Sequence, residues 1–474
     1  MVVALAAGLA LRAWMLSKLF EVSGDSLIYG GLAKNLLLHG RFALTLPNGE
    51  VYPTLIRLPG YPLFLALCFR LFGMENYFSA ACVQVAMDLA SCLLVADFVS
   101  RIAPAGRRKS AALAALWLAV LCPFTASYAA FPLTETATIF MLALAMDAMV
   151  RFRERPRWGS ALCFTFAVTL AALLRPDGAL AAVAFAPVLF LAMRSCNGPA
   201  RIPGRKLAPM AAMCVLLALA PFGAWAARNW SVFHVFEPLA PRLAVDPGES
   251  TNPGWQRWVK SWCLDFISTY QIYWNVPWDR LDMSELPKRA FDSSAQYAET
   301  AALAAEYNHS GYELTPQIDA GFARLAEERI AAHPPRYYLW LPLGRLADMF
   351  LRPRVENLPI DLDWWVYSHH RKETEFSWAY AALNAAYLAL GIAGLSLRPR
   401  FWMPLAAYLV LRSALLLTIE APETRYTLEC FPILMAAGGV AIAAVWNRWN
   451  RGRTRGQNPA TGLRPGPMPS ALYI

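Results

Sequence analysis

The sequence predicts an all-α polytopic membrane protein with about ten transmembrane helices. Of its 474 residues, 57% are hydrophobic and only 16% are charged, which is too apolar a composition for a soluble globular protein. In addition, Lys and Arg gather in short clusters between long apolar runs. Both observations place the chain, and therefore its function, at a membrane.

Ten apolar runs are long enough to cross the hydrocarbon core of a bilayer. In order, they cover residues 2–20, 77–100, 110–127, 132–150, 157–174, 177–194, 208–227, 377–397, 401–418 and 428–447. The first run has no basic segment before it and no small-residue cleavage site after it. We therefore expect a retained span there rather than a cleaved signal peptide.

The basic residues orient these helices. Five alternate connections hold 18 Lys and Arg, in "RIAPAGRRKS", "RFRERPRW", "RSCNGPARIPGRK", "RPR" and "RWNRGRTRG". The short connections on the other side, residues 123–131, 175–177 and 419–427, hold only Arg175 and Arg425. Because cytoplasmic loops are enriched in Lys and Arg, both termini are predicted to be cytoplasmic.

Two long segments then face outward. Residues 21–76 include the helical pattern "DSLIYGGLAKNLLLHG" and the short apolar helix "PGYPLFLALCFRLFG", both predicted to lie at the membrane interface. Residues 228–376 hold 20 of the 33 acidic residues, two amphipathic helical patterns and the aromatic interfacial pattern "PPRYYLWLPLGRLADMFLR". The predicted units are a membrane core (1–227), an outer subdomain (228–376), C-terminal transmembrane helices (377–447) and a basic cytoplasmic tail expected to be disordered (448–474).

Several functional classes find no support in the sequence. The formal charge of +10 is spread over the connections, so a nucleic-acid partner is not expected. The nine Cys show no CxxC spacing, and the adjacent His369 and His370 make a poor chelate, so neither a cofactor nor a metal site is expected. No P-loop, GxGxxG or GxSxG context appears, which argues against nucleotide hydrolysis and serine-hydrolase chemistry.

Arginines on the outer side are exceptions to the basic-inside pattern, so each requires a partner. Four are at helix ends on that side: Arg57, Arg175, Arg228 and Arg425. Carboxylates on the same side are Asp25, Glu135, Asp177, Glu420 and Glu423. The topology therefore delivers residues that are distant in sequence to one membrane surface. Because guanidinium groups pair bidentately with phosphate oxygens, this set suits a lipid-linked anion with a carboxylate base nearby.

Some of these residues also fit purely structural roles. Asp25 precedes a helical pattern, where Asp would cap free backbone N–H groups, and capping is compatible with catalysis. Arg57 and Arg228 also suit lipid headgroups or pairs with loop acids. Arg175 and Asp177 in "LLRPDGAL" also suit a simple turn between two spans.

Two further acids fall inside apolar runs, where burial without a partner is costly. Glu135 in "FPLTETATIF" lies one turn into a span behind a Pro, which favours a functional role. Asp88, in the middle of a span in "VQVAMDLAS", is a second-rank candidate, because a hydrogen bond between helices also explains it.

A series of motifs runs through most of the chain in order: "GDSLIYGGLAKNLLLHGRF", "RLPGYPLFLALCFRLFG", "PLTETATIFMLALAM", "LAALLRPDGAL", "PFGAWAARNWSVF", "IAAHPPRYYLWLPLGRL" and "PETRYTLECFPILMAAGG". In these motifs and in having seven spans before a large outer loop, the chain resembles the polytopic GT-C glycosyltransferases. The resemblance is to the family 39 group of protein O-mannosyltransferases, lipid A aminoarabinose transferases and Rgt-type bacterial sugar transferases. It is strongest over residues 1–235.

The resemblance implies a transferase that moves a sugar from a polyprenyl-phosphate-linked donor to a hydroxyl of a glycan, lipid or protein. It implies a location in a bacterial inner membrane, among membrane lipids, with the site on the periplasmic face. The family's acid in the first outer loop maps onto Asp25, its basic residue before the PGYP segment onto Arg57, and its acid in "TE" onto Glu135. Ser26 follows Asp25 where the family often has a second acid, so the sequence gives no support to a divalent metal there.

In this interpretation, Asp25 is the base that takes the proton of the acceptor. Arg57, Arg228, Arg425 and Arg175 bind the donor phosphate and stabilise it as it leaves, and a single displacement inverts the anomeric centre. The supporting residues are Glu135, Asp177, Tyr61 and Glu423. The apolar "LPGYPLFLAL" helix is expected to hold the polyprenyl tail. Trp side chains of the outer loop are expected to stack on sugar rings or, alternatively, to form a membrane-anchoring belt.

The main alternative is a transporter or flippase of a lipid-linked sugar. Transporters commonly show internal repeats and charged or broken helices near the middle of the membrane. The sequence shows no convincing repeat, and its polar groups crowd one surface. These features favour an enzyme.

Overall fold

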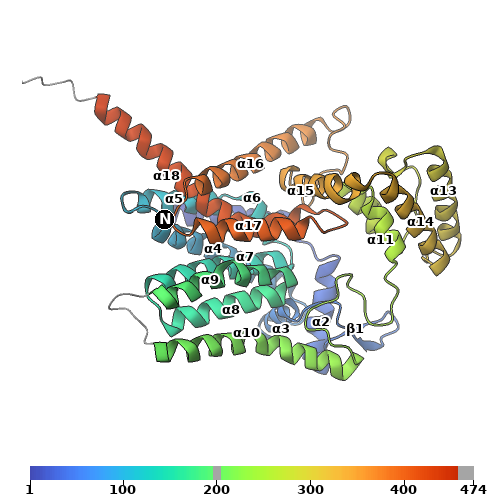
Figure 1. Ribbon diagram of the computed structural model, residues 1–474, viewed down its shortest axis with the longest axis horizontal. Coiled ribbons are helices and arrows are strands. Elements are labelled where there is room, and N and C mark those ends of the chain that lie inside the picture. The colour runs from blue at the N-terminus through green and yellow to red at the C-terminus, as the bar shows by residue number, and fades with distance from the viewer. Residues whose placement is uncertain (196–203, 457–474) are drawn as a thin grey trace, which may run out of the picture.

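The computed structural model describes residues 1–195 and 204–456, in which long helices form a bundle and a smaller helical subdomain lies at one end of it (Figure 1). The predicted apolar runs correspond to α1 (Val2–Leu19), α4 (Tyr77–Ile102), α5 (Arg108–Val120), α7 (Thr134–Glu154), α8 (Trp158–Leu174), α9 (Ala179–Ser195), α10 (Gly204–Phe233), α16 (Arg371–Ser396), α17 (Trp402–Leu416) and α18 (Phe431–Gly456). Their shared core is made mainly of Ala, Leu, Val and Phe. The all-α class is therefore confirmed.

Length and apolarity identify the helices that can cross a membrane. Within residues 1–195 and 204–456, five segments meet both criteria: Val2–Leu19, Tyr77–Ile102, Ala208–Phe233, Arg371–Ser396 and Thr424–Asn450. Shorter apolar helices, among them Trp158–Leu174, Pro176–Leu191 and Trp402–Leu416, accompany them. The protein is thus an integral membrane protein, whereas the number of ten spans stays a prediction.

One predicted span proves to be two helices. The apolar run 110–127 was expected to be continuous, but α5 ends at Val120 and a separate short helix, α6 (Pro123–Tyr128), begins at Pro123. Pro lacks an N–H and has a fixed φ, so it suits the first position of a new helix and interrupts an existing one. The expectation of a single span over this range was wrong.

The first outer segment folds beside the end of the bundle that carries the subdomain. It forms α2 (Asp25–His39), the hairpin β1 (Ala43–Thr45) and β2 (Val51–Pro53), and α3 (Gly60–Phe72), as seen in Figure 1. The hairpin was not predicted. Ala43 pairs with Pro53 and Thr45 with Val51, and the Asn35 side chain donates a hydrogen bond to the Ala43 carbonyl at 2.9 Å. Helix α2 and the hairpin therefore form one unit.

The outer subdomain has its own core. It contains α11 (Pro253–Lys260), α13 (Ser294–His309), α14 (Pro316–Ala332) and α15 (Leu341–Leu351), which confirms both predicted amphipathic helices. Trp255, Trp258 and Trp262 are almost fully buried there: Trp255 and Trp258 pack against Phe322, and Trp262 packs against Trp258. These three Trp are therefore core residues, and the expectation that they stack on sugars or line a membrane belt was wrong. Tyr338 and Trp340, 67% and 64% exposed, keep the predicted interfacial character of their segment.

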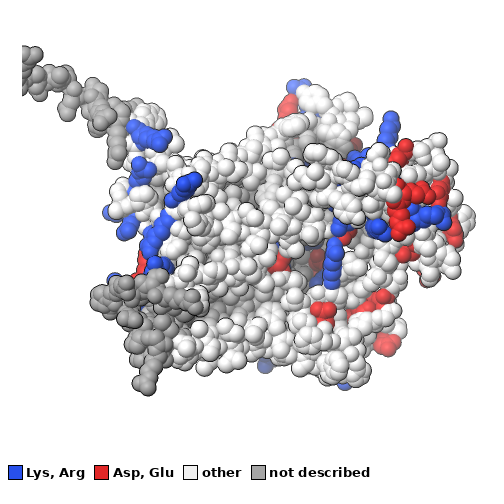
Figure 2. Space-filling model, viewed as in Figure 1, with Lys and Arg blue, Asp and Glu red and all other residues white. Residues whose placement is uncertain are grey.

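Charge is distributed unevenly over the molecule. Figure 2 shows Lys and Arg around the end of the bundle at the left, and Asp and Glu concentrated on the subdomain at the right. Parts of two basic segments, 194–206 and the tail 448–474, lie outside the described residues. The expectation that the tail is disordered concerns residues that largely lie outside the described part of the chain. The predicted orientation, with the basic end in the cytoplasm, stays a prediction that agrees with this asymmetry.

An ion pair lies in the middle of the bundle. Arg12 of α1 is fully buried and contacts Asp88 Oδ2 of α4 at 2.6 Å. The same guanidinium donates to the carbonyl of Val120 at 2.8 Å, at the C-terminal end of α5. Asp88 thus serves to join helices, and its second-rank functional candidacy is replaced by this structural role. The sequence reading missed Arg12, although an arginine inside an apolar run calls for a partner.

Removing one member of this pair should destabilise the bundle strongly. We expect Arg12→Met to cost about 3–5 kcal/mol, because it leaves the Asp88 carboxylate buried and unpaired. The double variant Arg12→Met/Asp88→Leu should recover most of that stability. The part that stays lost is the hydrogen bond from Arg12 to the Val120 carbonyl. Thermal unfolding in detergent measures both variants. Equal melting temperatures for the single and double variants would contradict this account.

Candidate active site

Asp25 starts α2 and is held between two arginines. The residue before it, Gly24, has φ of 51°, a conformation that glycine adopts readily, and the helix start has no side-chain capping hydrogen bond. Arg57 Nη2 donates to Asp25 Oδ1 at 2.7 Å, and Arg425 approaches Asp25 Oδ2 at 3.5 Å. The capping interpretation of Asp25 is therefore wrong, and its carboxylate is committed to ion pairs.

Arg425 connects Asp25 with two further acids. Its Nε lies 2.5 Å from Glu423 Oε2, and its Nη1 lies 3.8 Å from Glu135 Oε1. Its guanidinium also lies over the ring of Tyr426, with 5.6 Å to the centroid. Arg425, Glu423 and Glu135, which the sequence predicted separately, are thus brought together with Asp25. The four residues come from three distant parts of the chain.

The backbone around Arg425 is anchored by other arginines. Arg354 donates to the Thr424 carbonyl at 2.9 Å, and Arg412 donates to the Tyr426 carbonyl at 3.0 Å. Both guanidinium groups are buried. They satisfy carbonyls on each side of Arg425, so that side chain is presented from a fixed segment.

Arg175 is surrounded by carboxylates. It contacts Glu135 at 3.0 Å, Asp177 at 3.3 Å and Glu429 at 3.4 Å. The turn that carries it packs closely on α8, because a Cβ at Gly178 would lie 2.2 Å from the Ala171 carbonyl oxygen. The segment is a turn, as one interpretation held, and it also places Arg175 and Asp177 in the ion-pair network.

Arg412 and Glu429 complete the network from the C-terminal helices. Arg412, in α17, pairs with Asp177 and contacts Glu429 Oε2 at 2.8 Å, and both Arg412 and Glu429 are 1% exposed. The sequence reading missed both. Arg412 lies inside an apolar run, where an isolated arginine is a signal for an internal partner.

We call these nine residues the outer charge cluster: Asp25, Arg57, Glu135, Arg175, Asp177, Arg412, Glu423, Arg425 and Glu429. Its exposure is graded. Asp25, Arg57 and Arg425 are 28%, 21% and 20% exposed, whereas Arg412 is 1% exposed. The buried acids are thus matched largely by Arg175 and Arg412, and the accessible part presents one carboxylate with two guanidinium groups.

Tyr61 supports this arrangement from behind. It is fully buried, its hydroxyl donates to Gln84 Oε1 at 2.5 Å, and its ring packs against Tyr29 with centroids 5.0 Å apart. The Arg57 guanidinium in turn lies over the Tyr29 ring, with its central carbon 5.9 Å from the ring centroid. Tyr61 therefore acts through the ring that positions Arg57.

Arg228 and Glu420 have partners elsewhere. Arg228 donates to the carbonyls of Thr54 at 2.8 Å and Phe42 at 2.7 Å, and so ties α10 to the hairpin region. Glu420 pairs with Arg242 and, at 3.3 Å, with Lys260 of the subdomain. Within the described residues, neither contacts the outer charge cluster, although topology alone suggested that they share its surface.

A second group of polar residues borders the cluster next to Arg425. Thr424 Oγ1 donates to Glu356 Oε2 at 2.9 Å, and Arg352 Nε lies 3.3 Å from Glu356 Oε1. Burial raises the pKa of Glu356 above its ordinary value, although Arg352 opposes it. The sequence reading missed Arg352 and Glu356 because nothing local connects them with Arg425.

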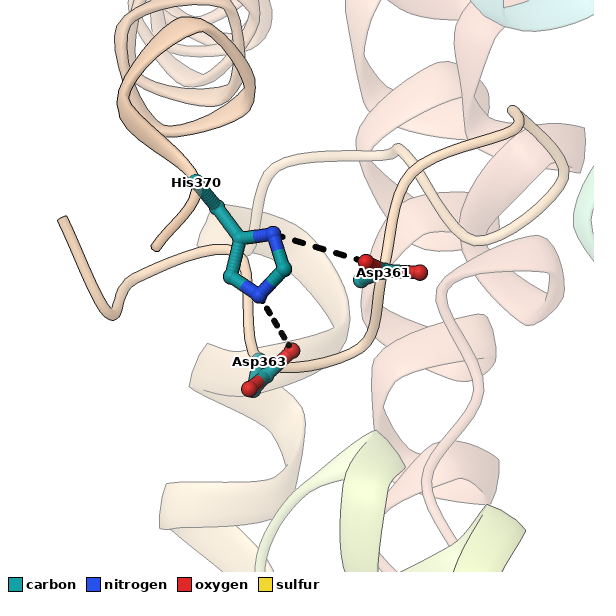
Figure 3. Close-up of side chains that lie close together, drawn as sticks. All are labelled: Asp361, Asp363 and His370. Atoms are coloured by element: carbon teal, nitrogen blue, oxygen red, sulfur yellow. Dashed lines mark ion pairs between the residues drawn. The ribbon is translucent and has the colours of Figure 1, made fainter. Parts of the chain in front are cut away.

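One group of side chains in the described part of the chain has donor atoms close enough to hold a metal ion: Asp361, Asp363 and His370 (Figure 3). Nδ1 of His370 lies 3.4 Å from Asp361, and its Nε2 lies 3.2 Å from Asp363. Each ring nitrogen thus faces a carboxylate oxygen, and both acids are exposed. None of the three residues belongs to the outer charge cluster.

The two arginines set the protonation of Asp25. Burial raises its pKa, but Arg425 and Arg57 outweigh burial and hold the pKa below its ordinary value. Asp25 is therefore ionised at neutral pH. Its contribution to stability is fully present above the unfolded pKa, about 3.9, and is lost as the pH falls through the lower folded value.

This coupling predicts a pH shift. In Arg57→Gln, the pKa of Asp25 should rise, so the acid limb of kcat/KM should move to higher pH than in the wild type. The pH profile of the sugar transfer that the motif resemblance implies measures it. Arg41→Gln, which changes an exposed arginine in the same outer segment, should leave the limb in place. An equal shift in both variants would contradict the pairing of Arg57 with Asp25.

Comparisons with known proteins agree with the motif analysis over part of the chain. Residues 56–225 match the family described as dolichyl-phosphate-mannose-protein mannosyltransferase. The predicted resemblance is therefore confirmed for this range, which contains Arg57, Tyr61, Glu135, Arg175 and Asp177. Asp25, Arg425 and Glu423 lie outside it. No curated protein sequence matches the chain.

Two solved structures are similar to the chain at low identity. One is the archaeal oligosaccharyltransferase AglB from Archaeoglobus fulgidus, in complex with an inhibitory peptide and a dolichol-phosphate. The two sequences are 12% identical, the match covers 98% of this chain and 52% of that chain, and the TM-score is 0.48. The other is ArnT from Cupriavidus metallidurans bound to undecaprenyl phosphate. The two sequences are 15% identical, the match covers 98% of this chain and 81% of that chain, and the TM-score is 0.38. The chain thus spans 52% of the length of AglB.

Proposed function

We propose that this protein is a membrane glycosyltransferase that moves a sugar from a polyprenyl-phosphate-linked donor to an acceptor hydroxyl. The observation that carries the proposal is the accessible part of the outer charge cluster, where the Asp25 carboxylate lies between Arg57 and Arg425. The match of residues 56–225 to a family described as using dolichyl-phosphate-mannose supports the same chemistry.

The reaction needs a base and a stabilised leaving group. The acceptor oxygen attacks the anomeric carbon while its proton passes to the Asp25 carboxylate. The bond from the anomeric carbon to the phosphate oxygen breaks, and its electron pair stays on the polyprenyl phosphate. A single displacement of this kind inverts the anomeric centre.

Arg57 and Arg425 are the donor phosphate ligands in this proposal. Arg425 contacts Asp25 at 3.5 Å, whereas Arg57 contacts it at 2.7 Å, so Arg425 is the partner that is easier to redirect toward a phosphate. When it turns to the phosphate, Asp25 loses one cationic neighbour and its pKa rises, which makes it a better base. The charge that builds on the leaving phosphate is then stabilised by the guanidinium groups of Arg425 and Arg57.

The remaining residues play positioning roles. Arg175 balances Glu135, Asp177 and Glu429 beneath the site. Arg228 holds the hairpin region through the carbonyls of Thr54 and Phe42, and phosphate binding by Arg228 would require it to leave both.

The proposal includes a location and substrates. The cluster lies at the end of the bundle opposite the basic residues, which supports a reaction on the periplasmic face of a bacterial inner membrane. The donor sugar is a hexose or pentose, and the acceptor is a glycan, lipid or protein hydroxyl. The exposed apolar side chains Leu63 and Leu67 of α3 offer a surface for the polyprenyl tail.

The test uses purified full-length protein in lipid nanodiscs with radiolabelled polyprenyl-phosphate hexoses and pentoses and an envelope extract as acceptor. We expect release of polyprenyl phosphate together with labelled product from at least one donor. If every donor stays intact while proteoliposomes of the same protein move labelled lipid between leaflets, the protein is a flippase and the proposal fails.

A further inference from the structure

A cavity lined by arginines lies at the end of the bundle opposite Asp25. Its volume is about 550 Å³, and it is lined by Arg101, Arg151, Glu154, Arg155, Arg157, Gly159 and Ser160. These residues come from the ends of α4 and α7, the connection after α7, and the first turn of α8. No part of the transfer reaction described above uses this cavity.

The acids at this end are already paired. Arg101 contacts Asp97 at 2.9 Å and Glu154 at 2.7 Å. Arg151 contacts Asp97 at 2.6 Å and Asp147 at 2.5 Å. Each of the three acids of this group thus contacts Arg101 or Arg151, so that two guanidinium groups face three carboxylates.

Arg155 and Arg157 bring this group to four guanidinium groups against three carboxylates, so its net charge is positive. Both are exposed, and within residues 1–195 and 204–456 neither has an ion-pair partner. They flank Pro156 in the connection between α7 and α8. The first turn of α8 adds backbone N–H groups, because that helix start has no side-chain cap. Two free guanidinium groups and helix N-terminal amides in one cavity suit a phosphate group.

The surface next to the cavity is apolar, which identifies the kind of molecule that carries the phosphate. Trp158, Leu162 and Phe166 follow at helical spacing along α8 and are 45%, 38% and 54% exposed. This stripe starts at the cavity and runs along the bundle. A free anion would gain nothing from it, whereas the acyl chains of a lipid would cover it.

We propose that this cavity binds the headgroup of an anionic phospholipid from the adjacent leaflet, with the acyl chains against Trp158, Leu162 and Phe166. Arg155 and Arg157 contact the phosphate. The site is independent of the proposed transferase reaction, and its test needs no sugar donor.

The test is native mass spectrometry of the full-length protein in detergent, titrated with phosphatidylglycerol or with phosphatidylcholine of the same acyl chains. We expect a preference for phosphatidylglycerol in the wild type. Arg155→Gln/Arg157→Gln should weaken its binding about 25-fold, at roughly fivefold per arginine. Arg107→Gln/Arg108→Gln removes the same charge from the same end outside the cavity and should change binding less than about twofold.

Three outcomes overturn the proposal. The first is equal affinity of the wild type for the two lipids, which can be judged even if a variant folds poorly. The second is equal losses in the two double variants, which would indicate a general charge effect. The third is displacement of the phosphatidylglycerol by millimolar inorganic phosphate, which would show that the cavity recognises a free anion.

Discussion

Asp25→Asn should lower kcat for sugar transfer about 10²–10⁴-fold, the range expected for loss of a general base. Asparagine has nearly the same shape and can still accept a hydrogen bond from Arg57, so the fold and donor binding should persist. The loss should therefore appear in kcat rather than in KM. Transfer from a labelled donor that the wild type accepts, measured under saturating conditions, provides the value.

The matched control is Glu50→Gln, which neutralises an exposed carboxylate in the hairpin turn of the same outer segment. It should keep wild-type kcat. If Asp25→Asn keeps more than a tenth of the wild-type kcat, Asp25 is not the base. Asp25→Asn that elutes and melts like the wild type but binds no donor would instead make Asp25 a binding residue.

Arg425→Gln should lower kcat about 10²–10³-fold, because it removes a charged donor aimed at the leaving phosphate. Arg425→Lys should recover only part of this loss, since lysine keeps the charge but lacks the planar fork that binds phosphate bidentately. The pH profile gives a second readout. The acid limb of kcat/KM should move to higher pH in Arg425→Gln, because Asp25 loses one of the two cations that lower its pKa.

Arg242→Gln is the control for this change. Arg242 is an outer arginine, 64% exposed, that pairs with Glu420 outside the outer charge cluster. Its loss should affect neither kcat nor the acid limb. Equal losses of kcat in the two variants would point to general electrostatic attraction of the donor, and a normal kcat in Arg425→Gln would remove Arg425 from the proposed mechanism.

Local patterns predicted most of the helices. The run "GYPLFLALCFRLFG" predicted a short helix, and α3 spans Gly60–Phe72. The two amphipathic patterns of the outer segment became α13 and α14. These predictions held because helical periodicity depends on neighbours three and four residues apart, which the sequence displays directly.

The sequence also determined which end of the bundle carries the site. The distribution of Lys and Arg over alternate connections predicted that Asp25, Glu135, Arg175 and Arg425 lie at one surface. The structure joins all four in the outer charge cluster. This succeeded because topology alone decides the end at which each connection lies.

Only the tertiary structure decided which of these charges meet. Arg228 shares the predicted surface but ties α10 to the hairpin, while Arg412 reaches Asp177 and Glu429 from within an apolar helix. The same holds for Arg12 and Asp88, and for the Trp residues of the outer segment that became a core. The sequence thus determined the membrane class, most of the helices and the end of the bundle at which the outer charge cluster forms. Lateral helix packing determined the partners, because an ion pair depends on side chains meeting within a few ångströms across helices, and spacing along the chain carries no such information.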